Sequence, residues 1–407
     1  MVVVVNGPAS DPRPARTSGP STRELERLLR RQAAGALVPA DLDATVAIDG
    51  ARNGGWTVRI GSGRMEIESG VPERPTVRVT ADARTVSEVF RGDRSGVEAF
   101  LLGRLRVRGN LALALRLDSM LNPDHPPARW PRWKTVRAAG IRTAYLEAGE
   151  GEPVVLLHGL GATNASFLPT LWDLARDHRV VAPDLPGFGD SAKPMRAYHA
   201  HFFSWWLAEF LERVRIPKAD IVGNSMGGRV ALELGLASPE RVDRLVLLMP
   251  SPAFIRYREF VRIARILRPE LALLPVPVSH RQVVRSIRRM FARPSRLPGA
   301  WYDAAADEFL RVFSTPRGRI AFFSAARQIY LEEPYGERGF WDRLPSLSRP
   351  ALFVWGARDR LVPAAFARHV QKALPDSASA VLEDCGHVPQ YEWPDRTHAM
   401  IRDFLAA

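Results

Sequence analysis

The sequence predicts an α/β protein with a mostly parallel sheet and a helical cap, preceded by a small α+β domain. Beyond residue 133, continuous apolar runs such as "PVVLLHG", "ADIVGNS" and "ALFVWG" alternate with helical segments, the pattern of strands buried on both faces of a parallel sheet. Before residue 122, apolar residues recur with period two between turn signals, which is typical of a smaller sheet. The proline-rich stretch "NPDHPPARWPRW" separates the two patterns and is expected to be a linker.

These patterns divide the chain into four parts. Residues 1–20 are rich in Pro, Gly and Ser and are expected to be a disordered tail. Residues 21–122 are expected to form the front domain, residues 123–132 the linker, and residues 133–407 the α/β domain. Residues 252–345 intervene between two strand-like runs and are mostly helical in pattern, so we expect them to form a cap over the carboxyl edge of the sheet.

The front domain begins with a helix signal and continues with short strands. Ser21 stands at the expected N-cap, and Glu24 follows three residues later, which completes a capping box. Alternating apolar residues predict strands near residues 56–60, 65–67 and 77–79, which we expect to form a small antiparallel sheet. Two helical segments, the strand "RLRVRG" and the apolar helix "NLALALRLDSML" complete the domain.

The composition is that of a folded globular protein, with 46% hydrophobic and 25% charged residues. The single cysteine, Cys385, excludes an intramolecular disulfide and suits a reducing compartment. The opening "MVVVV" is too short for a signal sequence, and no apolar run reaches the ~18 residues of a membrane span. We therefore expect a soluble, cytoplasmic protein, whose oligomeric state the sequence does not give.

Basic residues are in excess, with a formal net charge of +13. The excess is concentrated between residues 253 and 296, where eleven arginines stand against two glutamates. Such a cluster is typical of a solvated basic face, or of a surface that attracts an anionic membrane or an acidic substrate. No recognised nucleic-acid module accompanies the charge, so we expect no nucleic-acid partner.

The stretch "IVGNSMGGRV" places Ser225 between an apolar strand and a helix. Gly223 and Gly227 complete a G-x-S-x-G pattern, whose small residues allow a sharp turn that lifts the serine hydroxyl above the sheet. The N-terminus of the following helix favours the negative charge that develops there during acyl transfer. Ser225 is therefore the candidate nucleophile.

A serine nucleophile needs a base, and the base needs an orienting acid. After such a serine turn the expected chain order is serine, acid, histidine, with the acid and the histidine each following a later strand. Asp359 follows the strand in "ALFVWGARDRLVP", and His387 follows the strand in "SASAVLEDCGHVPQYEWP". Both are expected at the carboxyl edge where Ser225 emerges.

An acyl-transfer site also needs N–H donors for the oxyanion. The backbone N–H of Met226, directly after the serine, is one candidate, and that of Leu160 in "LLHGLGA" is the second. His158 is expected to shape this loop, and Asp184 and Asp190 of "PDLPGFGDS" are expected to have structural roles. Such a site requires no metal ion and no organic cofactor.

The motifs together resemble the α/β-hydrolase superfamily over residues 133–407. They are "HGLG", "DLPGFGDS", "GNSMGG", "GARDRLVP" and "CGHVPQYEWP", in this order. The resemblance implies a Ser–His–Asp triad made of Ser225, His387 and Asp359. "GNSMGG" is also similar to the C–C bond hydrolases that cleave ring-fission products.

Residues 45–122 resemble the sterol carrier protein 2 (SCP2) family, an α+β lipid-binding fold. The resemblance rests on strand pairing followed by "TVSEVFRGDRSGVEAFLLGRLRVRGNLALALRL". It implies a tunnel for a sterol or an acyl chain between the sheet and the helices. A structural domain with a filled core is the alternative.

These features predict a serine hydrolase of apolar acyl esters, similar to lipases and esterases. In this prediction Ser225 attacks, His387 carries the proton and Asp359 orients His387. The expected partner is an apolar or lipid-like substrate, and the basic segment 253–296 is expected to contact an anionic membrane surface. Three alternatives stay open: a C–C bond hydrolase of dienolic ketones, a thioesterase or acyltransferase that uses the arginines on an acidic carrier, and a lipid carrier without enzymatic activity.

Overall fold

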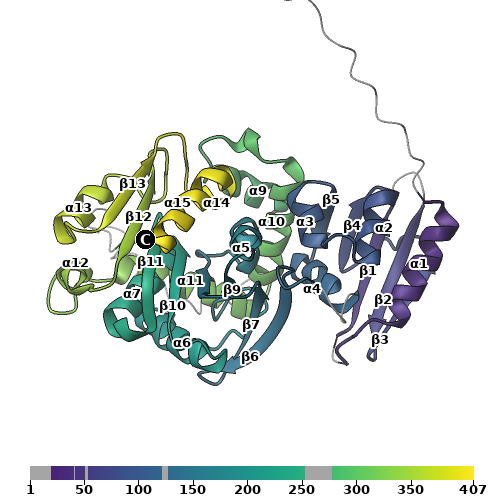
Figure 1. Cartoon of the computed structure of the whole chain (residues 1–407), viewed down its shortest axis with the longest axis horizontal. Coiled ribbons are helices and arrows are strands. Elements are labelled where there is room, and N and C mark those ends of the chain that lie inside the picture. The colour runs from purple at the N-terminus through teal and green to yellow at the C-terminus, as the bar shows by residue number, and fades with distance from the viewer. Residues whose placement is uncertain (1–19, 41, 51–53, 122–126, 253–276) are drawn as a thin grey trace, which may run out of the picture.

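The computed structural model describes residues 20–40, 42–50, 54–121, 127–252 and 277–407. Most of the expected tail, part of the expected linker and the first part of the expected cap, residues 253–276, lie outside the described residues. The chain forms a five-stranded sheet near its N-terminus and an eight-stranded sheet beyond it. Figure 1 shows the two sheets side by side along the long axis of the molecule.

The front domain combines the smaller sheet with four described helices. The predicted capping box is present, since Ser21 accepts the Glu24 N–H and the Glu24 carboxylate accepts the Ser21 N–H at 2.7 Å. The elements are α1 (Thr22–Ala34), β1 (Ala44–Asp49), β2 (Gly55–Gly61), β3 (Arg64–Ser69), β4 (Val77–Ala81), α2 (Ala83–Arg91), α3 (Gly96–Leu101), β5 (Leu105–Gly109) and α4 (Leu111–Leu121).

The front sheet is mixed, so the prediction of an antiparallel sheet was wrong in one pairing. Its strand order is β3-β2-β1-β4-β5, and β1 pairs with β4 in parallel. The sequence pattern had not indicated β1, which lies at the centre of the sheet with its middle residues Val46, Ala47 and Ile48 all buried. A strand buried on both faces shows no period-two alternation. Because β1 was not predicted, the parallel pairing of the predicted strand β4 with it could not be predicted either.

The second domain holds the eight-stranded sheet, in the order β13-β12-β11-β10-β8-β9-β7-β6. The strands from β8 to β13 are parallel, as predicted, and an antiparallel hairpin of β6 and β7 extends the edge beside β9. The strands are β6 (Arg132–Ala138), β7 (Ile141–Ala148), β8 (Pro153–Leu157), β9 (Arg179–Pro183), β10 (Ala219–Asn224), β11 (Val242–Leu248), β12 (Ala351–Gly356) and β13 (Ala378–Leu382).

Helices cover both faces of this sheet. Alternate strand residues point to opposite faces, so Val154 packs in one buried cluster with residues of α5 and α15, whereas Val155 packs in another with residues of α6, α7 and α13. These helices are α5 (Leu168–Leu174), α6 (Ala200–Arg213), α7 (Met226–Ala237), α13 (Phe366–Ala373) and α15 (Pro394–Ala406), with the short α14 (Pro389–Glu392) before the last. Within the described ranges, no helix is both long and apolar enough to span a bilayer.

The cap also contacts the front domain. Its described helices are α9 (His280–Arg288), α10 (Gly299–Phe313), α11 (Pro316–Leu331) and α12 (Phe340–Arg343). Figure 1 shows α10 next to the front domain, where it packs against β5 and α4. Asp307 of α10 accepts hydrogen bonds from Arg108 Nε at 2.7 Å and from the Gly109 N–H at 2.8 Å. Buried residues of α4, such as Leu113, belong to the same apolar cluster as Leu146 and Val154 of the second domain. The two domains therefore share a continuous core.

Candidate active site

Ser225 lies on a strained turn between β10 and α7. Its φ is 54° and its ψ −118°, a conformation that non-glycine residues rarely adopt and that concentrates at functional sites. A Cβ on Gly223 would lie 2.5 Å from the Gly227 carbonyl oxygen, and one on Gly227 would lie 2.0 Å from the Leu157 carbonyl oxygen. The two glycines of the motif are thus required by the close approach of backbone segments, as the sequence predicts.

Neighbouring strands hold this turn in place. The Ser225 N–H donates to the Leu248 carbonyl at 2.9 Å, and the Ser225 carbonyl accepts the N–H of Arg229 at 3.1 Å and of Ser251 at 3.0 Å. The turn is therefore bonded to the end of β11, to α7 and to the segment after β11. Such anchoring keeps the strained conformation in place.

Asp359 and His387 meet at the carboxyl edge of the sheet. His387 Nδ1 lies 2.6 Å from Asp359 Oδ2, and both side chains are buried. The other carboxylate oxygen, Oδ1, accepts the backbone N–H groups of Leu361 at 2.7 Å and Val362 at 3.0 Å. With Nδ1–H donated to the carboxylate, Nε2 of His387 is left as the proton acceptor.

The structure connects this pair to Ser225 through Asn224. The Asn224 side-chain amide donates to the His387 carbonyl at 3.1 Å and to the Leu248 carbonyl at 3.0 Å. Among the hydrogen bonds of the described residues, none joins the Ser225 hydroxyl to His387. Catalytic hydrogen bonds often form only when substrate is bound, so the transfer of a proton from Ser225 to His387 belongs to the proposed mechanism.

The loop that contains Leu160 packs against Ser225. A Cβ on Gly159 would lie 3.3 Å from the Ser225 Cβ, which places the backbone of this loop directly beside the serine. Met226 is the first residue of α7, where backbone N–H groups have no partner inside the helix. In the described part of the chain, the N–H groups of Leu160 and Met226 have no hydrogen-bond acceptor, so both can bind an oxyanion.

His158 shapes this loop, as predicted. Its Nδ1 donates to the Gly159 carbonyl at 2.8 Å, and its Nε2 accepts the Leu185 N–H at 3.0 Å. Complete burial lowers the pKa of His158 to about 4, so the ring is neutral in this tautomer near pH 7. With both ring nitrogens occupied, His158 is not available as a base.

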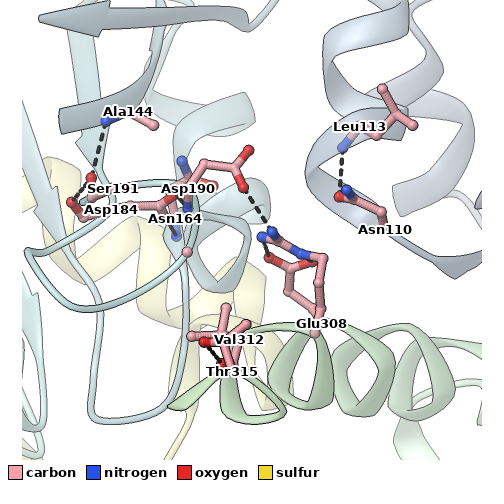
Figure 2. A network of polar contacts seen from close by, with 12 residues as sticks. Asn110, Leu113, Ala144, Asn164, Asp184, Asp190, Ser191, Glu308, Val312 and Thr315 are labelled. Carbon is pink, nitrogen blue, oxygen red and sulfur yellow. Dashed lines mark hydrogen bonds and ion pairs between the residues drawn. The ribbon is translucent and has the colours of Figure 1, made fainter. Parts of the chain in front are cut away.

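Asp184 and Asp190 have the structural roles that the sequence predicts, and Asp190 also contacts the cap. The buried Asp184 carboxylate accepts the backbone N–H groups of Asn164 and Asp190, each at 2.8 Å. Burial, reinforced by the charge of Asp190, raises the pKa of Asp184 to about 7. Asp190 pairs with Arg311 of α10 at 2.8 Å, and Arg311 also pairs with Glu308 at 2.6 Å (Figure 2). The turn beside the active site is thus connected to the cap.

Sequence reasoning missed a second connection to the cap, made by Glu392. Its buried carboxylate accepts the Gly386 N–H at 2.7 Å and the N–H of the cap residue Arg293 at 2.6 Å. The next backbone N–H, that of His387, donates to the cap carbonyl of Met290 at 2.7 Å. The acid in "CGHVPQYEWP" was visible in the sequence, but one of its two partners, Arg293, lies 99 residues earlier in the chain. Glu392 holds the histidine loop against the cap.

Cys385 and the aromatic residues of α6 have the structural roles that their positions suggest. The Cys385 thiol is buried, and burial together with the charge of Glu392 raises its pKa, which keeps it protonated. Phe203, Trp206 and Phe210 of α6 are buried in the core against the sheet. Within the described residues, no group of three or more His, Cys, Asp or Glu side chains is arranged to hold a metal ion.

Aromatic side chains of the cap lie over the loop that contains Leu160. A Cβ on Gly161 would lie 2.9 Å from Phe322 and 3.1 Å from Phe309, and these rings form a cluster with Phe313 and Phe323. The surroundings of the candidate oxyanion donors are therefore apolar on the cap side. Such surroundings suit a substrate with an apolar acyl part.

Residues 152–394, more than half of the chain, match the family described as the alpha/beta hydrolase fold. The chain belongs to this family. Residues 25–122 match the SCP-2 sterol transfer family, so this α/β hydrolase carries an SCP2 domain at its front. Both resemblances that the sequence indicates are confirmed.

The relatives of this α/β hydrolase are named for different substrates. It is 28% identical to the 2-hydroxymuconate semialdehyde hydrolase of Pseudomonas sp. (strain CF600) over 67% of this chain and 93% of that protein. It is 30% identical to the pimeloyl-[acyl-carrier protein] methyl ester esterase of Aeromonas salmonicida (strain A449) over 63% of this chain and 96% of that protein. Among solved structures, a membrane phospholipase A is similar with a TM-score of 0.59 and 25% identity over 76% of this chain and 91% of that one. These relatives support a hydrolase.

Proposed function

We propose that this protein is a serine hydrolase that cleaves carboxylic esters of apolar, lipid-like substrates. The observation that carries the proposal is the strained conformation of Ser225 at the sheet edge where His387 and Asp359 form a buried pair. A serine on such a turn, close to a histidine whose tautomer is fixed by a carboxylate, has the parts of an activated nucleophile.

In the proposed mechanism, Ser225 Oγ attacks the ester carbonyl carbon while its proton passes to His387 Nε2. The carbonyl oxygen becomes an oxyanion, which the N–H groups of Leu160 and Met226 bind. As the C–O bond to the leaving alcohol breaks, His387 gives its proton to that alcohol, and an acyl-enzyme remains. A water molecule then attacks the acyl carbon with His387 as base, which releases the carboxylic acid and restores Ser225. Asp359 stabilises the protonated His387 in both steps.

Two features support an apolar acyl part. The cluster of Phe309, Phe313 and Phe322 lies beside the loop that contains Leu160. The SCP2 domain contains a cavity of about 60 Å³ between its sheet and α2, α3 and α4, lined by apolar residues only. Ligand pockets typically measure about 300–1,000 Å³, so a lipid chain would enter this smaller cavity by displacing side chains. The phospholipase among the similar structures is consistent with a lipid-like substrate.

A second candidate reaction is C–C bond hydrolysis of a dienolic ketone. It is favoured by "GNSMGG" and by the relative that is named for 2-hydroxymuconate semialdehyde. The same three residues would act, with the carbonyl of the ketone in place of the ester carbonyl. A panel of substrates therefore has to separate the two reactions.

The test is turnover of medium- and long-chain esters, acyl-CoA thioesters and dienolic ketones by the wild type and by Ser225→Ala. We expect esters to be the best substrates and the substitution to lower kcat on the order of 10⁵-fold, because loss of the nucleophile removes the acyl-enzyme route. Ser238→Ala, at the other end of α7, is the matched control and should keep full activity.

Labelling by a fluorophosphonate probe provides an independent readout. Wild type and Ser238→Ala should be labelled, and Ser225→Ala should not. Retained turnover or labelling in Ser225→Ala would contradict the mechanism, and a preference for the dienolic ketone would replace the ester proposal by the second candidate. Lipid binding by an unlabelled wild type would favour a carrier without enzymatic activity.

A further inference from the structure

A groove rich in arginine lies on the cap, outside the catalytic residues. It is formed by α9, by the residues that follow α9, and by the loop after β12. Its other lining residues are apolar, and no carboxylate lines it. The charged residues of this arginine groove are Arg281, Arg285, Arg288, Arg289 and Arg360.

These arginines are concentrated on one concave surface and have no carboxylate partner among the described residues. Elsewhere, arginines such as Arg311 and Arg343 are paired with carboxylates. In the groove, Arg288 lies over the ring of Tyr302 at 4.8 Å. No carboxylate of the described residues lies within ion-pair distance of Arg281, Arg285, Arg289 or Arg360, all of which are exposed to solvent. Positive charges concentrated in a concave surface attract anions strongly.

The groove borders the loops that hold the candidate catalytic pair. Arg360 directly follows Asp359 in the chain. Just beyond α9, the carbonyl of Met290 accepts the His387 N–H at 2.7 Å. A group bound in the groove would therefore lie beside both loops, although it would not touch the reacting atoms.

We infer that the arginine groove binds the phosphate groups of anionic phospholipids and thereby docks the cap on a lipid surface. Guanidinium groups match phosphate oxygens with paired N–H donors, and several on one surface add their contributions to binding. Arg281 and Arg285 of α9 and Arg289 at its C-cap are four residues apart and so lie along one side of that helix.

The apolar surroundings of the groove favour a lipid surface over other anionic partners. Leu361, beside Arg360 in the chain, leaves 51% of its surface exposed, which suits contact with acyl chains at a membrane interface. The one aromatic residue of the lining, Phe291, is buried, so the lining offers no aromatic face for stacking of nucleic-acid bases. The choice of a lipid surface also rests on the proposed function, which places a lipid-like substrate at the neighbouring site.

The test is flotation of the full chain, carrying Ser225→Ala to prevent turnover, with vesicles of phosphatidylcholine alone or mixed with phosphatidylglycerol. We expect binding to the mixed vesicles only, and weaker binding at high salt. Adding Arg281→Gln, Arg285→Gln and Arg289→Gln should lower partition on the order of 100-fold, at roughly 5-fold for each arginine near the surface. Arg360 is left unchanged because it adjoins Asp359.

A matched control removes the same charge at the same spacing elsewhere. Arg23→Gln, Arg27→Gln and Arg31→Gln on α1 of the front domain, also four residues apart and exposed, should change partition by less than about 5-fold. The α9 variant, made with Ser225 intact, should hydrolyse a soluble short-chain ester as the wild type does, which shows that it folds. If the wild type hydrolyses no ester, the proposed function is wrong, but the flotation experiment still tests whether the arginine groove binds vesicles.

Three results would overturn the inference. The first is absence of binding to the mixed vesicles, and the second is equal loss of binding in the α1 and α9 variants, which would indicate a nonspecific effect of net charge. The third is binding of RNA, of an acidic carrier protein or of inorganic phosphate through the same three arginines with no preference for vesicles.

Discussion

The two domains bury different kinds of polar group. Among the described residues, the front domain buries only hydroxyl side chains, those of Thr57, Thr85, Ser87 and Ser95. The hydrolase domain buries ionisable groups, which are Asp184, Asp220, Arg229, Glu233, Glu308, Arg319, Asp359, His158, His387, Glu392 and His398. Burial of a charge is costly unless it is paired. The contrast indicates that the front domain has a more apolar interior, whereas the hydrolase domain holds ionisable groups at fixed positions.

Glu233 shows how the hydrolase domain stabilises such a group. Burial by itself would raise the pKa of this carboxyl, but hydrogen bonds from Arg343 and the charge of Arg229 lower it to about 2. Arg229 also pairs with Glu332 of the cap. Removal of one member of such a network leaves an uncompensated charge, so these contacts fix the cap on the domain as well as stabilising it.

The largest predicted effect concerns the pH dependence of the free energy of unfolding. It tests whether the buried carboxyl of Asp184 makes stability depend on pH, as no buried polar side chain of the described front domain can. Its folded pKa of about 7 lies above the ordinary value of 3.8, so between these pH values the folded state holds a proton that the unfolded state has lost. The free energy of unfolding should therefore fall as pH rises from 4 to 7, by up to on the order of 4 kcal/mol from this group.

Asp184→Asn should flatten that dependence, which urea unfolding at several pH values measures. Burial lowers the pKa values of His158 and His398 to about 4, so these two groups lower the free energy of unfolding as pH falls, opposite to the effect of Asp184. The slope of the variant is therefore compared with that of the wild type, in which both histidines are also present. Ser87→Ala, which removes a buried hydroxyl from the front domain, should leave the slope unchanged. An unchanged slope in Asp184→Asn would show that this carboxyl is ionised throughout.

The second prediction concerns Glu392 and sharpens the contrast between a buried and a surface acid. In Glu392→Gln only one oxygen remains for the two N–H groups of Gly386 and Arg293, so the histidine loop should lose part of its support. An unsatisfied N–H costs about 1–3 kcal/mol. A rise of this size in the activation free energy lowers kcat about 10- to 100-fold.

The measurements for Glu392→Gln are kcat, KM and the pH profile of kcat. A positioning role predicts a lower kcat, a nearly unchanged KM and a displaced acidic limb of the profile, on which protonation of His387 removes the base. Glu68→Gln, which removes an exposed ion-pair acid of the front sheet, should leave all three unchanged. A lower melting temperature with normal kcat would mean that Glu392 only stabilises the fold.

The smallest predicted effect concerns the apolar cavity of the front domain. Ala114 lines the apolar cavity, and Ala114→Leu places three additional carbon atoms at its wall. Overpacking costs about 1–3 kcal/mol, so binding of a pyrene-labelled fatty acid should weaken about 10-fold or more, whereas hydrolysis of a short soluble ester stays unchanged. Ala34→Leu, exposed on α1, is the control; equal binding by both variants would show that the cavity is not the lipid site.

The sequence predicted those parts of the molecule that local patterns determine. The parallel strands, the capping box of Ser21 and the glycines around Ser225 each follow from spacing and backbone sterics. The positions of Asp359 and His387 follow from the rule that parallel strands end at one edge. Ser225 and the two N–H donors lie where the sequence placed them, and their catalytic roles stay a prediction until they are tested.

The parts that the sequence did not predict depend on contacts between distant segments. Strand β1 was not predicted, because a strand buried on both faces shows no alternation of apolar and polar residues. Without β1, its parallel pairing with β4 could not be predicted either. The contacts of Asp190 with Arg311 and of Glu392 with Arg293 join residues 121 and 99 positions apart. No local pattern indicates which arginine of a cluster will meet which acid, because the path of the cap decides it.

The contact of Arg108 with Asp307 has a consequence for synthesis of the chain. The partners are 199 residues apart, and α10 is one of the elements against which α4 and β5 pack. At about 5–20 residues per second, roughly 10 to 40 seconds separate translation of the two residues. During that interval the surface of α4 and β5 that α10 later covers is exposed to solvent. We therefore expect chaperones to bind the nascent chain mainly at this stage.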